Sequence, residues 1–402
     1  MQKKTLPVLF ATLLIDMIGI GMVIPIIPII FTDPGSPSFL LHGYSQNAQY
    51  LIAGATTALF GLMQFIAAPI LGELSDVYGR KRLLTVGVAV LALSQLLFGF
   101  GIEVASLGLL LFARAVAGLA GGNFSIAQAS IADVTEPKDR AKNFGLIGAA
   151  FGIGFILGPL LGGWIAHITG SAAAPFLVAG MMGIANIVFI SLFLPETRKD
   201  KTARRAFTFF KGIHNIRAAL RDVDARPVYI SSFLYISGFS FFISFIGILL
   251  VSRFSLSEAS LGTFFGAVGA WIVITQLFIL RILSKKYSER AILRWSLLVL
   301  AGTLAVYPFA PSVVFVYVLI PFLAIPNGLS MANMSALVSK SVSPDKQGAA
   351  LGINGSLMAF SQGMIPLVAG VGSGVLGIQA PFIAGAALVV AARAVLFARK
   401  RK

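Results

Sequence analysis

Apolar residues run along this chain in long stretches that are separated by short polar clusters. A helix needs roughly 20 apolar residues to cross the hydrocarbon core of a bilayer. The strict alternation of apolar and polar positions that marks a membrane β-barrel is missing from the sequence. The pattern therefore predicts an all-α membrane protein with twelve spans, near 7–30, 50–71, 84–101, 107–132, 144–167, 174–194, 228–251, 260–282, 291–309, 312–337, 348–371 and 377–397.

Composition and charge refine this picture. Of the 402 residues, 57% are hydrophobic and 11% charged, and the formal net charge is +16. So basic a chain could bind nucleic acid, but its Lys and Arg gather in alternate connections, and only Arg253 breaks the pattern. This distribution follows the positive-inside rule. It predicts a multi-pass protein of the inner (plasma) membrane with both termini in the cytoplasm, and it argues against a nucleic-acid partner.

The sequence offers little for other chemistry. It has no Cys and three His, which lie in loops or at span ends without the spacing of metal ligands. It contains no P-loop for ATP and no paired nucleophile and base. We therefore expect no enzyme activity, no catalytic residue, no cofactor and no metal site.

A long basic insertion divides the chain into two sets of six spans. We expect a bundle at 1–194, a linker at 195–227 and a second bundle at 228–402. One shift of register superposes five Gly or Pro positions of the two halves, among them Gly148 on Gly355 and Pro159 on Pro366, as in transporters built from parallel repeats. The linker predicts an interfacial amphipathic helix, or alternatively a disordered basic segment; its apolar positions are Phe207, Phe210, Ile213, Ile216 and Leu220.

The loop between spans 2 and 3 has the most specific motif, GELSDVYGRKRLLT at 72–85. Glycine tolerates backbone conformations that tight turns require. The pattern G-x-L-x-D-x-x-G-R-K-x-x-L resembles the signature loop of the major facilitator superfamily, and the alternative is a turn with ordinary positive-inside charges. Its defining residues are Gly72, Asp76, Gly79, Arg80 and Lys81.

The resemblance implies a fold of two six-helix bundles with pseudo-two-fold symmetry and a role for this loop. In that family the loop is thought to latch the cytoplasmic side shut. By resemblance, Asp76 would face the positive N-terminal end of span 11, and Arg80 would pair with Asp133. The corresponding loop of the second half, 281–291, keeps basic residues but lacks the glycines and the matching acid.

Span 5 contains a glycine pattern, GLIGAAFGIGFILGPLLGG at 145–163. Small residues let helices approach closely, and simple close packing is the alternative explanation. The spacing is similar to the motif associated with antiporters of the superfamily, and the first half resembles the tetracycline/proton antiporter group more strongly than the part after residue 227. The motif positions are Gly145, Gly154, Gly158, Pro159, Gly162 and Gly163.

Two charges lie deep within spans, Asp16 in span 1 and Arg114 in span 4. Ionisable residues inside a membrane are costly and are candidates for function. Burial disfavours the charged form of a carboxyl group, so Asp16 is the candidate proton carrier, and an acid stands at the same place in the tetracycline antiporters. Arg114 stands in a stretch that resembles the span 4 motif of proton-coupled members. Arg114 would tune Asp16, or the two would form a purely structural pair.

Polar and aromatic residues inside the spans are candidates for a central cavity. Such a cavity would hold an amphipathic organic molecule by apolar contact and a few hydrogen bonds, although each residue could equally serve packing. The second half has no acid within a span, which argues against a relay of several carboxylates. The candidates are Gln64, Asn123, Gln128, Tyr235, Phe242, Gln276, Asn327, Asn354, Met358 and Gln362.

The sequence thus predicts a secondary transporter that exports a small, drug-like compound in exchange for protons by alternating access. Its partners would be that solute, protons and the lipid bilayer, and a monomer is expected. Two alternatives stay open. The chain could be a symporter or facilitator for a metabolite, or a membrane sensor that transports nothing.

Overall fold

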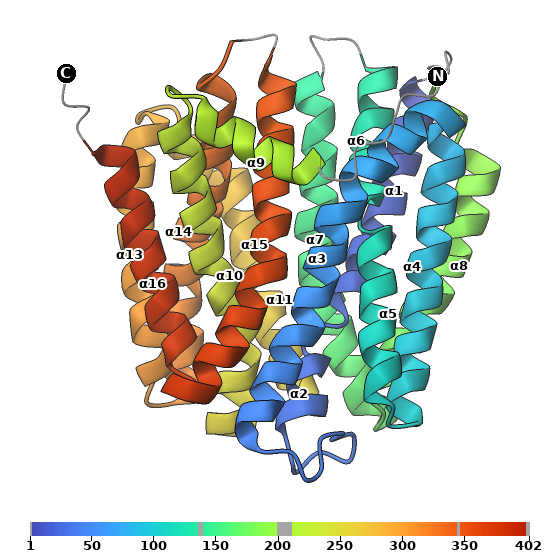
Figure 1. Cartoon of the computed structure of the whole chain (residues 1–402), viewed down its shortest axis with the longest axis vertical. Coiled ribbons are helices and arrows are strands. Elements are labelled where there is room, and N and C mark those ends of the chain that lie inside the picture. The colour runs from blue at the N-terminus through green and yellow to red at the C-terminus, as the bar shows by residue number, and fades with distance from the viewer. Residues whose placement is uncertain (1, 136–139, 199–210, 344–345, 399–402) are drawn as a thin grey trace. The chain divides into compact units, whose positions relative to one another are not determined.

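The computed structural model describes residues 2–135, 140–198, 211–343 and 346–398. These residues fold mainly into helices (Figure 1). Within them, twelve helical segments are long and apolar enough to cross a membrane, from Thr5–Thr32 to Ala380–Phe397. The all-helical class and the number of spans are therefore as the hydrophobic pattern predicts.

The first six spans contain eight helices, because span 1 and span 4 are each broken into two. The break in span 1 follows Gly21, and that in span 4 falls at Gly121 and Gly122. The helices are α1 (Gln2–Gly21), α2 (Ile26–Thr32), α3 (Gln46–Tyr78), α4 (Arg80–Glu103), α5 (Leu107–Ala120), α6 (Asn123–Val134), α7 (Arg140–Thr169) and α8 (Ala174–Phe193).

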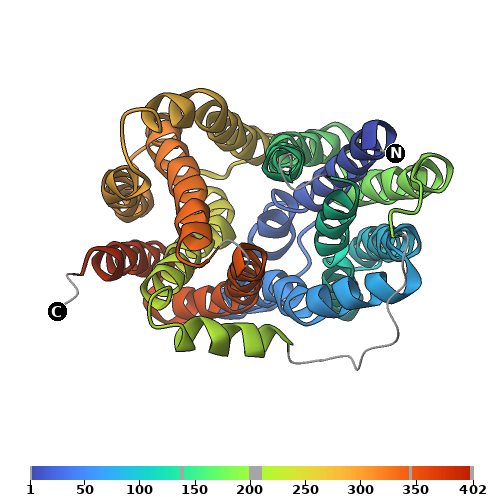
Figure 2. The same cartoon turned by 90° about the horizontal axis from the view of Figure 1, so that it is seen from above.

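The linker contains the short helix α9 (Lys211–Arg221), and Phe207 and Phe210 lie outside the described residues. In Figure 2, where α15 is seen nearly end-on, α9 is seen from its side. Asn215 Nδ2 donates to Ser356 Oγ of α15 at 2.9 Å. Ile213 and Leu220 are exposed, and the interfacial position of this helix stays a prediction.

The remaining spans follow after residue 225. A π-helical turn, η2 (Thr275–Ile279), interrupts span 8, and the short 3₁₀ turn η3 (Tyr307–Phe309) ends span 9. The helices are α10 (Arg226–Phe254), α11 (Glu258–Ile274), α12 (Leu280–Leu283), α13 (Glu289–Val306), α14 (Val313–Lys340), α15 (Gln347–Leu376) and α16 (Ala380–Phe397).

The chain packs into two compact units whose boundaries differ from the predicted bundles. Unit 1 comprises 1–42, 59–211 and 256–266, and unit 2 comprises 43–58, 212–255 and 267–402. The start of α3 therefore packs with the second half, and the start of α11 packs with the first. Within unit 1, α4 lies between α5 and α8 (Figure 1), and α1 packs on α7.

Glycine contacts explain why the start of α11 packs in unit 1 and the start of α3 packs in unit 2. In unit 1, a Cβ on Gly163 of α7 would collide with the Glu258 carbonyl of α11, and one on Gly262 would lie 2.5 Å from the Pro159 carbonyl oxygen. In unit 2, a Cβ on Gly370 of α15 would lie 2.7 Å from the Tyr50 carbonyl oxygen of α3. Such close backbone approach is possible only where a side chain is missing.

These two crossings involve matching positions of the predicted repeat. Pro159 and Gly163 meet α11 in unit 1, and Pro366 and Gly370 meet α3 in unit 2. The register shift that superposes Pro159 on Pro366 also superposes Gly163 on Gly370. The repeat seen in the sequence therefore has a structural counterpart, a pair of equivalent helix contacts.

Candidate functional site

The carboxylate of Asp16 lies on α1 and is 4% exposed. Asn123, the first residue of α6, donates from Nδ2 to Asp16 Oδ2 at 3.1 Å. Asn186 of α8 donates from Nδ2 to Asp16 Oδ1 at 3.1 Å and to the Thr12 carbonyl oxygen at 3.2 Å. Each carboxylate oxygen thus receives one amide hydrogen bond. We call Thr12, Asp16, Asn123 and Asn186 the Asp16 cluster.

The break in span 4 places Asn123 within reach of Asp16. Gly121 packs against Gln64 and Gly122 against Leu71, at distances that leave no space for a Cβ. A Cβ at Gly87 of α4 would overlap the Asn123 amide oxygen. Three glycines therefore bring the start of α6 close to α3 and α4, and Asn123 then lies beside α1.

The Asp16 cluster contains more hydrogen-bonding capacity than it uses. Within the described part of the chain, Thr12 Oγ1, Asn123 Oδ1 and Asn186 Oδ1 are buried without a hydrogen-bond partner. Unpaired buried polar atoms are rare in native structures and call for an explanation. A cavity of about 10 Å³ borders Asp16 and Gln95, close to the smallest space that holds one water molecule.

Arg114 lies on α5 and is buried. Its guanidinium carbon is 5.0 Å from the centre of the Phe60 ring of α3, a cation–π contact. Among the described residues, the hydrogen bonds that the Asp16 carboxylate accepts come from the two asparagines. The structure thus gives Asp16 two amide partners, and the expected influence of Arg114 on Asp16 stays a prediction.

A second group of polar residues, the Arg80 cluster, lies at the motif loop and comprises Asp76, Arg80, Asp133 and Glu196. Arg80 is buried; its Nε lies 3.0 Å from Asp133 Oδ2, and its Nη2 lies 2.5 Å from Asp76 Oδ1. The backbone N–H of Arg80 also donates to Glu196 Oε1 at 2.9 Å. Arg80 thus meets the loop acid Asp76 on α3 and its expected partner Asp133 on α6.

The loop glycines and Lys81 lie around this cluster. Gly79 has a φ of +100°, a conformation that favours glycine, and a Cβ there would collide with Glu196. The Gly72 carbonyl oxygen accepts a hydrogen bond from Arg80 Nη1 at 3.4 Å. Lys81 Nζ donates to the Ser191 carbonyl oxygen of α8 at 2.8 Å. The spacing of the loop therefore serves to bring one arginine to several acids.

The glycines of span 5 fall on two faces of α7. A Cβ on Gly154 would collide with Met17, one on Gly158 would lie 2.7 Å from Gly21 Cα, and one on Gly162 would lie 2.5 Å from the Met22 carbonyl oxygen. Residues four apart share a helix face, so this face packs on α1, which carries Asp16. Pro159 and Gly163 form the neighbouring face against α11. Gly145 lies outside the part of α7 whose packing is described.

The candidate cavity residues of the first half have separate surroundings. Gln64 Nε2 donates to the Gly121 carbonyl oxygen at 3.3 Å. Asn123 belongs to the Asp16 cluster and is buried, while Gln128 is exposed. Gln64 and Gln128 thus retain access from outside the packed core, and Asn123 does not.

In unit 2 the candidates form neutral hydrogen bonds. Tyr235 Oη donates to Asn327 Oδ1 at 2.7 Å, and Ser232 Oγ donates to Asn354 Oδ1 at 2.7 Å. Gln276, in the π-helical turn, donates from Nε2 to the Gly328 carbonyl oxygen at 3.1 Å.

Exposure separates the remaining candidates of unit 2. Met358 and Gln362 are half-buried on α15. Phe242 is fully buried, with ring contacts to Tyr307 and Phe382. Phe242 is therefore a core residue here and does not line an accessible surface.

Sequence reasoning missed three residues of these clusters, Thr12, Asn186 and Glu196. It also missed Gly87, which packs against Asn123. Asn186 is a polar residue in the apolar span 6, and polar residues inside membrane helices are enriched at helix contacts. That signal was available but does not identify a partner. Glu196 and Gly87 gave no local signal, because their roles depend on contacts with residues far away in sequence.

Comparison with known proteins gives the family. The chain matches the profile of the Major Facilitator Superfamily over residues 9–270 and 228–402. It is 30% identical over 360 residues to the tetracycline resistance protein, class H, of Pasteurella multocida, covering 87% of this chain and 83% of that protein. It is 25% identical over 375 residues to the quinolone resistance protein NorA of Staphylococcus aureus, covering 92% and 90%.

Its fold is similar to that in the crystal structure of the human organic anion transporter MFSD10 (TETRAN). The TM-score is 0.74 at 24% identity, covering 98% of this chain and 99% of that one. The family match, together with twelve helical segments of spanning length among the described residues, identifies a multi-pass membrane transporter. This chain belongs to the major facilitator superfamily and is related to tetracycline and quinolone efflux proteins.

Proposed function

We propose that this protein exports a small amphipathic organic compound in exchange for protons, by alternating access. It would act as a monomer in the plasma membrane with both termini in the cytoplasm. The observation that carries the proposal is the Asp16 cluster, an acid inside a membrane span whose carboxylate accepts hydrogen bonds from two neutral amides.

A buried acid held by amides can change its charge without leaving another ion unpaired. In the ionised state both carboxylate oxygens accept N–H donors. After protonation Asp16 gains one O–H donor. Asn123 Oδ1, Asn186 Oδ1 and Thr12 Oγ1 have spare acceptor capacity in the described structure, so rotation of one amide would satisfy the new donor. The cluster thus offers partners to both charge states.

The glycine face of α7 packs on α1, so a shift of α1 at the Asp16 cluster would be passed to α7. Gly154, Gly158 and Gly162 pack on the stretch of α1 that begins one residue after Asp16. The other face of α7 packs on the start of α11. A change at Asp16 that shifts α1 would therefore act on the contact between α7 and α11, which joins the two sequence halves.

The nature of the solute is inferred from the relatives and from chemistry. The relatives' names refer to tetracycline and to quinolones, which are polar-edged aromatic compounds. In unit 1, the half-buried Gln64 and the exposed Gln128 offer hydrogen bonds. In unit 2, the half-buried Gln362 and Met358 offer a hydrogen bond and a flexible apolar contact. Each unit thus offers groups suited to an amphipathic compound.

The test is flux in proteoliposomes with an imposed pH gradient, with tetracycline and a quinolone as probes. Wild type should exchange solute for protons, and Asp16→Asn should lose the gradient-driven flux. Asp33→Asn removes an acid between α2 and α3 and is the matched control, which should behave as wild type. Solute counterflow without a gradient should persist in Asp16→Asn, which shows that the variant is folded.

The alternatives give different results in the same assay. Flux that ignores the gradient in wild type would indicate a facilitator. Solute uptake together with protons would indicate a symporter. No flux of any compound in a broad library would indicate a sensor. Gradient-driven exchange that survives in Asp16→Asn would contradict the role given to Asp16.

A further inference from the structure

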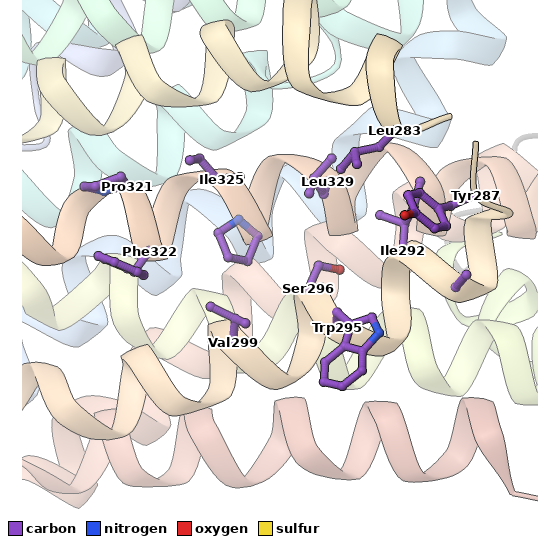
Figure 3. Close-up of a pocket in the computed structure, with 12 residues that line it drawn as sticks. Leu283, Tyr287, Ile292, Trp295, Ser296, Val299, Pro321, Phe322, Ile325 and Leu329 are labelled. Carbon is purple, nitrogen blue, oxygen red and sulfur yellow. The ribbon is translucent and has the colours of Figure 1, made fainter. Parts of the chain in front are cut away.

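An apolar groove lies in unit 2 between α13 and α14 (Figure 3). Its volume is about 570 Å³, and it is open on one side. Figure 3 shows Phe322, Ile325 and Leu329 on α14 opposite Val299 and Trp295 on α13, with Leu283 and Tyr287 at one end. We call this the α13–α14 groove.

Two prolines inside α14, Pro321 and Pro326, line the groove. Pro326 has no N–H, so the carbonyl of Phe322, four residues earlier, loses its helical partner. Thr303 Oγ1 of α13 lies 3.1 Å from that carbonyl oxygen and 2.9 Å from the Val299 carbonyl oxygen of its own helix, and its one proton serves both acceptors. This contact joins α13 to α14 beyond the groove. The groove is therefore built by fixed backbone and side-chain contacts.

The interior of the groove has almost no polar group to offer. Ser296 lies among aliphatic and aromatic lining residues, and its Oγ is already bonded to Ser330 Oγ at 2.9 Å. Sites for drug-like solutes combine apolar walls with a few polar groups that orient the ligand. The groove thus fits a plain hydrocarbon chain better than the transported solute.

The length of the groove matches one leaflet. From Ala291 to Val299 the lining part of α13 rises about 12 Å. Half of the hydrocarbon core is about 15 Å thick. Tyr287 is exposed at one end and Trp295 follows two turns later, and such residues are enriched at the membrane interface. The groove therefore runs from the interface to near the middle of the bilayer.

The interfacial end of the groove is strongly basic. Arg281, Lys285, Lys286 and Arg290 are exposed around the turn that contains Tyr287. The only acid in the segment 281–294 is Glu289, and it forms an ion pair with Lys340. In the proposed orientation this end faces the cytoplasm. Basic pockets between membrane helices on this side attract anionic lipid headgroups.

We propose that the α13–α14 groove binds an anionic phospholipid of the inner leaflet. One acyl chain occupies the groove, and the phosphate group contacts the cationic turn 281–290. The orientation rests on the proposed function, but the binding does not depend on proton exchange. The groove is a lipid site separate from the Asp16 cluster, which belongs to unit 1.

The test is native mass spectrometry of the detergent-purified full chain, incubated with dioleoyl phosphatidylglycerol or dioleoyl phosphatidylcholine. Wild type should retain phosphatidylglycerol about tenfold better than phosphatidylcholine. Val299→Trp fills the groove and should retain neither lipid. Ala291→Phe fills it more gently and should show the same loss, which guards against misfolding of the first variant. Val188→Trp adds the same bulk at an exposed position of α8 and should bind as wild type.

A separate variant tests how much the basic residues of the turn 281–290 contribute to lipid binding. The triple change Lys285→Gln, Lys286→Gln and Arg290→Gln should lower phosphatidylglycerol retention about tenfold, to the level of phosphatidylcholine, because the basic residues that attract the anionic headgroup are gone. It should leave phosphatidylcholine retention unchanged. Equal retention of the two lipids by wild type would overturn the proposal, as would full retention of phosphatidylglycerol by both groove-filling variants.

A different occupant gives a different outcome. If Val299→Trp keeps its phospholipid but slows tetracycline flux, the groove is a path for solute and the lipid proposal is wrong. Asp16→Asn should retain phosphatidylglycerol as wild type does. If wild type exchanges protons but shows no preference for phosphatidylglycerol, only the lipid proposal is wrong. If wild type binds phosphatidylglycerol in the groove but exchanges no protons, only the proposed function is wrong.

Discussion

The Asp16 cluster and the Arg80 cluster both organise carboxylates within unit 1, but they do so with opposite partners. In the Arg80 cluster, one buried guanidinium meets Asp76 and Asp133. In the Asp16 cluster, one buried carboxylate meets two neutral amides. Loss of one charge in the first would remove an ion pair from a buried guanidinium, which is costly. Loss of charge in the second leaves no ion behind.

The comparison shows that one helical unit contains an acid bound by a cation and an acid that accepts hydrogen bonds from two amides. Ion pairing fixes the motif loop to the ends of α3 and α6. Amide pairing holds Asp16 in place but permits its protonation. The partner of the acid, more than its burial, therefore distinguishes the two clusters, and under the proposed function the Asp16 cluster is the one that exchanges protons.

The largest expected effect on stability comes from removing the cation of the Arg80 cluster. Arg80→Gln leaves Asp76 and Asp133 without their shared partner and should destabilise the fold by about 3–5 kcal/mol. Thermal unfolding of the purified protein measures this. Adding Asp133→Asn should recover part of the loss. If Arg80→Gln unfolds like wild type, the cluster is not a fixed contact.

Asn186→Ala should have the next largest effect, because Asn186 donates to both Asp16 and the Thr12 carbonyl. Loss of these hydrogen bonds should cost about 1–3 kcal/mol. Gradient-driven exchange should depend on pH differently from wild type, because Asp16 loses one of its two amide partners, as flux measured across a pH series would show. An unchanged dependence of exchange on pH would show that Asn186 has no role in proton coupling.

Gly87→Ala should act on Asp16 without touching it. The added Cβ overlaps the Asn123 amide, so the amide must move away from the carboxylate. We expect the pH profile to shift in the same direction as in Asn123→Ala, with a stability loss of about 1 kcal/mol for one hydrogen bond. Gly148→Ala is the control, because nothing lies near its Cβ position. Different profiles for Gly87→Ala and Asn123→Ala would contradict this positioning role.

The smallest effect should come from the pair between Lys340 and Glu289. It is an ion pair like those of the Arg80 cluster, but the Lys340 side chain is 63% exposed. Exposed pairs contribute about 0–1 kcal/mol. Lys340→Gln should therefore shift the unfolding temperature only slightly. A loss as large as that of Arg80→Gln would show that burial is not what distinguishes the two pairs.

Much of the fold could be read from the sequence because helix formation in a membrane is local. Apolar stretches of spanning length must satisfy their backbone hydrogen bonds internally, so each of the twelve spans could be predicted from its own residues. The Arg80 contacts were partly predictable, since Asp76 and Arg80 are one helical turn apart and Asp133 followed from family resemblance. The breaks in spans 1 and 4 were not predicted, because glycines inside an apolar stretch do not reveal the neighbour that they will meet.

The sequence by itself determined that Asp16 is an isolated acid within a membrane span, that a glycine pattern runs along span 5, and that the loop at 72–82 carries its acid and basic residues. Only the tertiary structure decided which groups surround Asp16, since Asn123 and Asn186 are 107 and 170 residues away along the chain. Such contacts depend on where α6 begins and on how α8 packs beside α1. Those positions follow from close packing between helices, which no single stretch of sequence specifies.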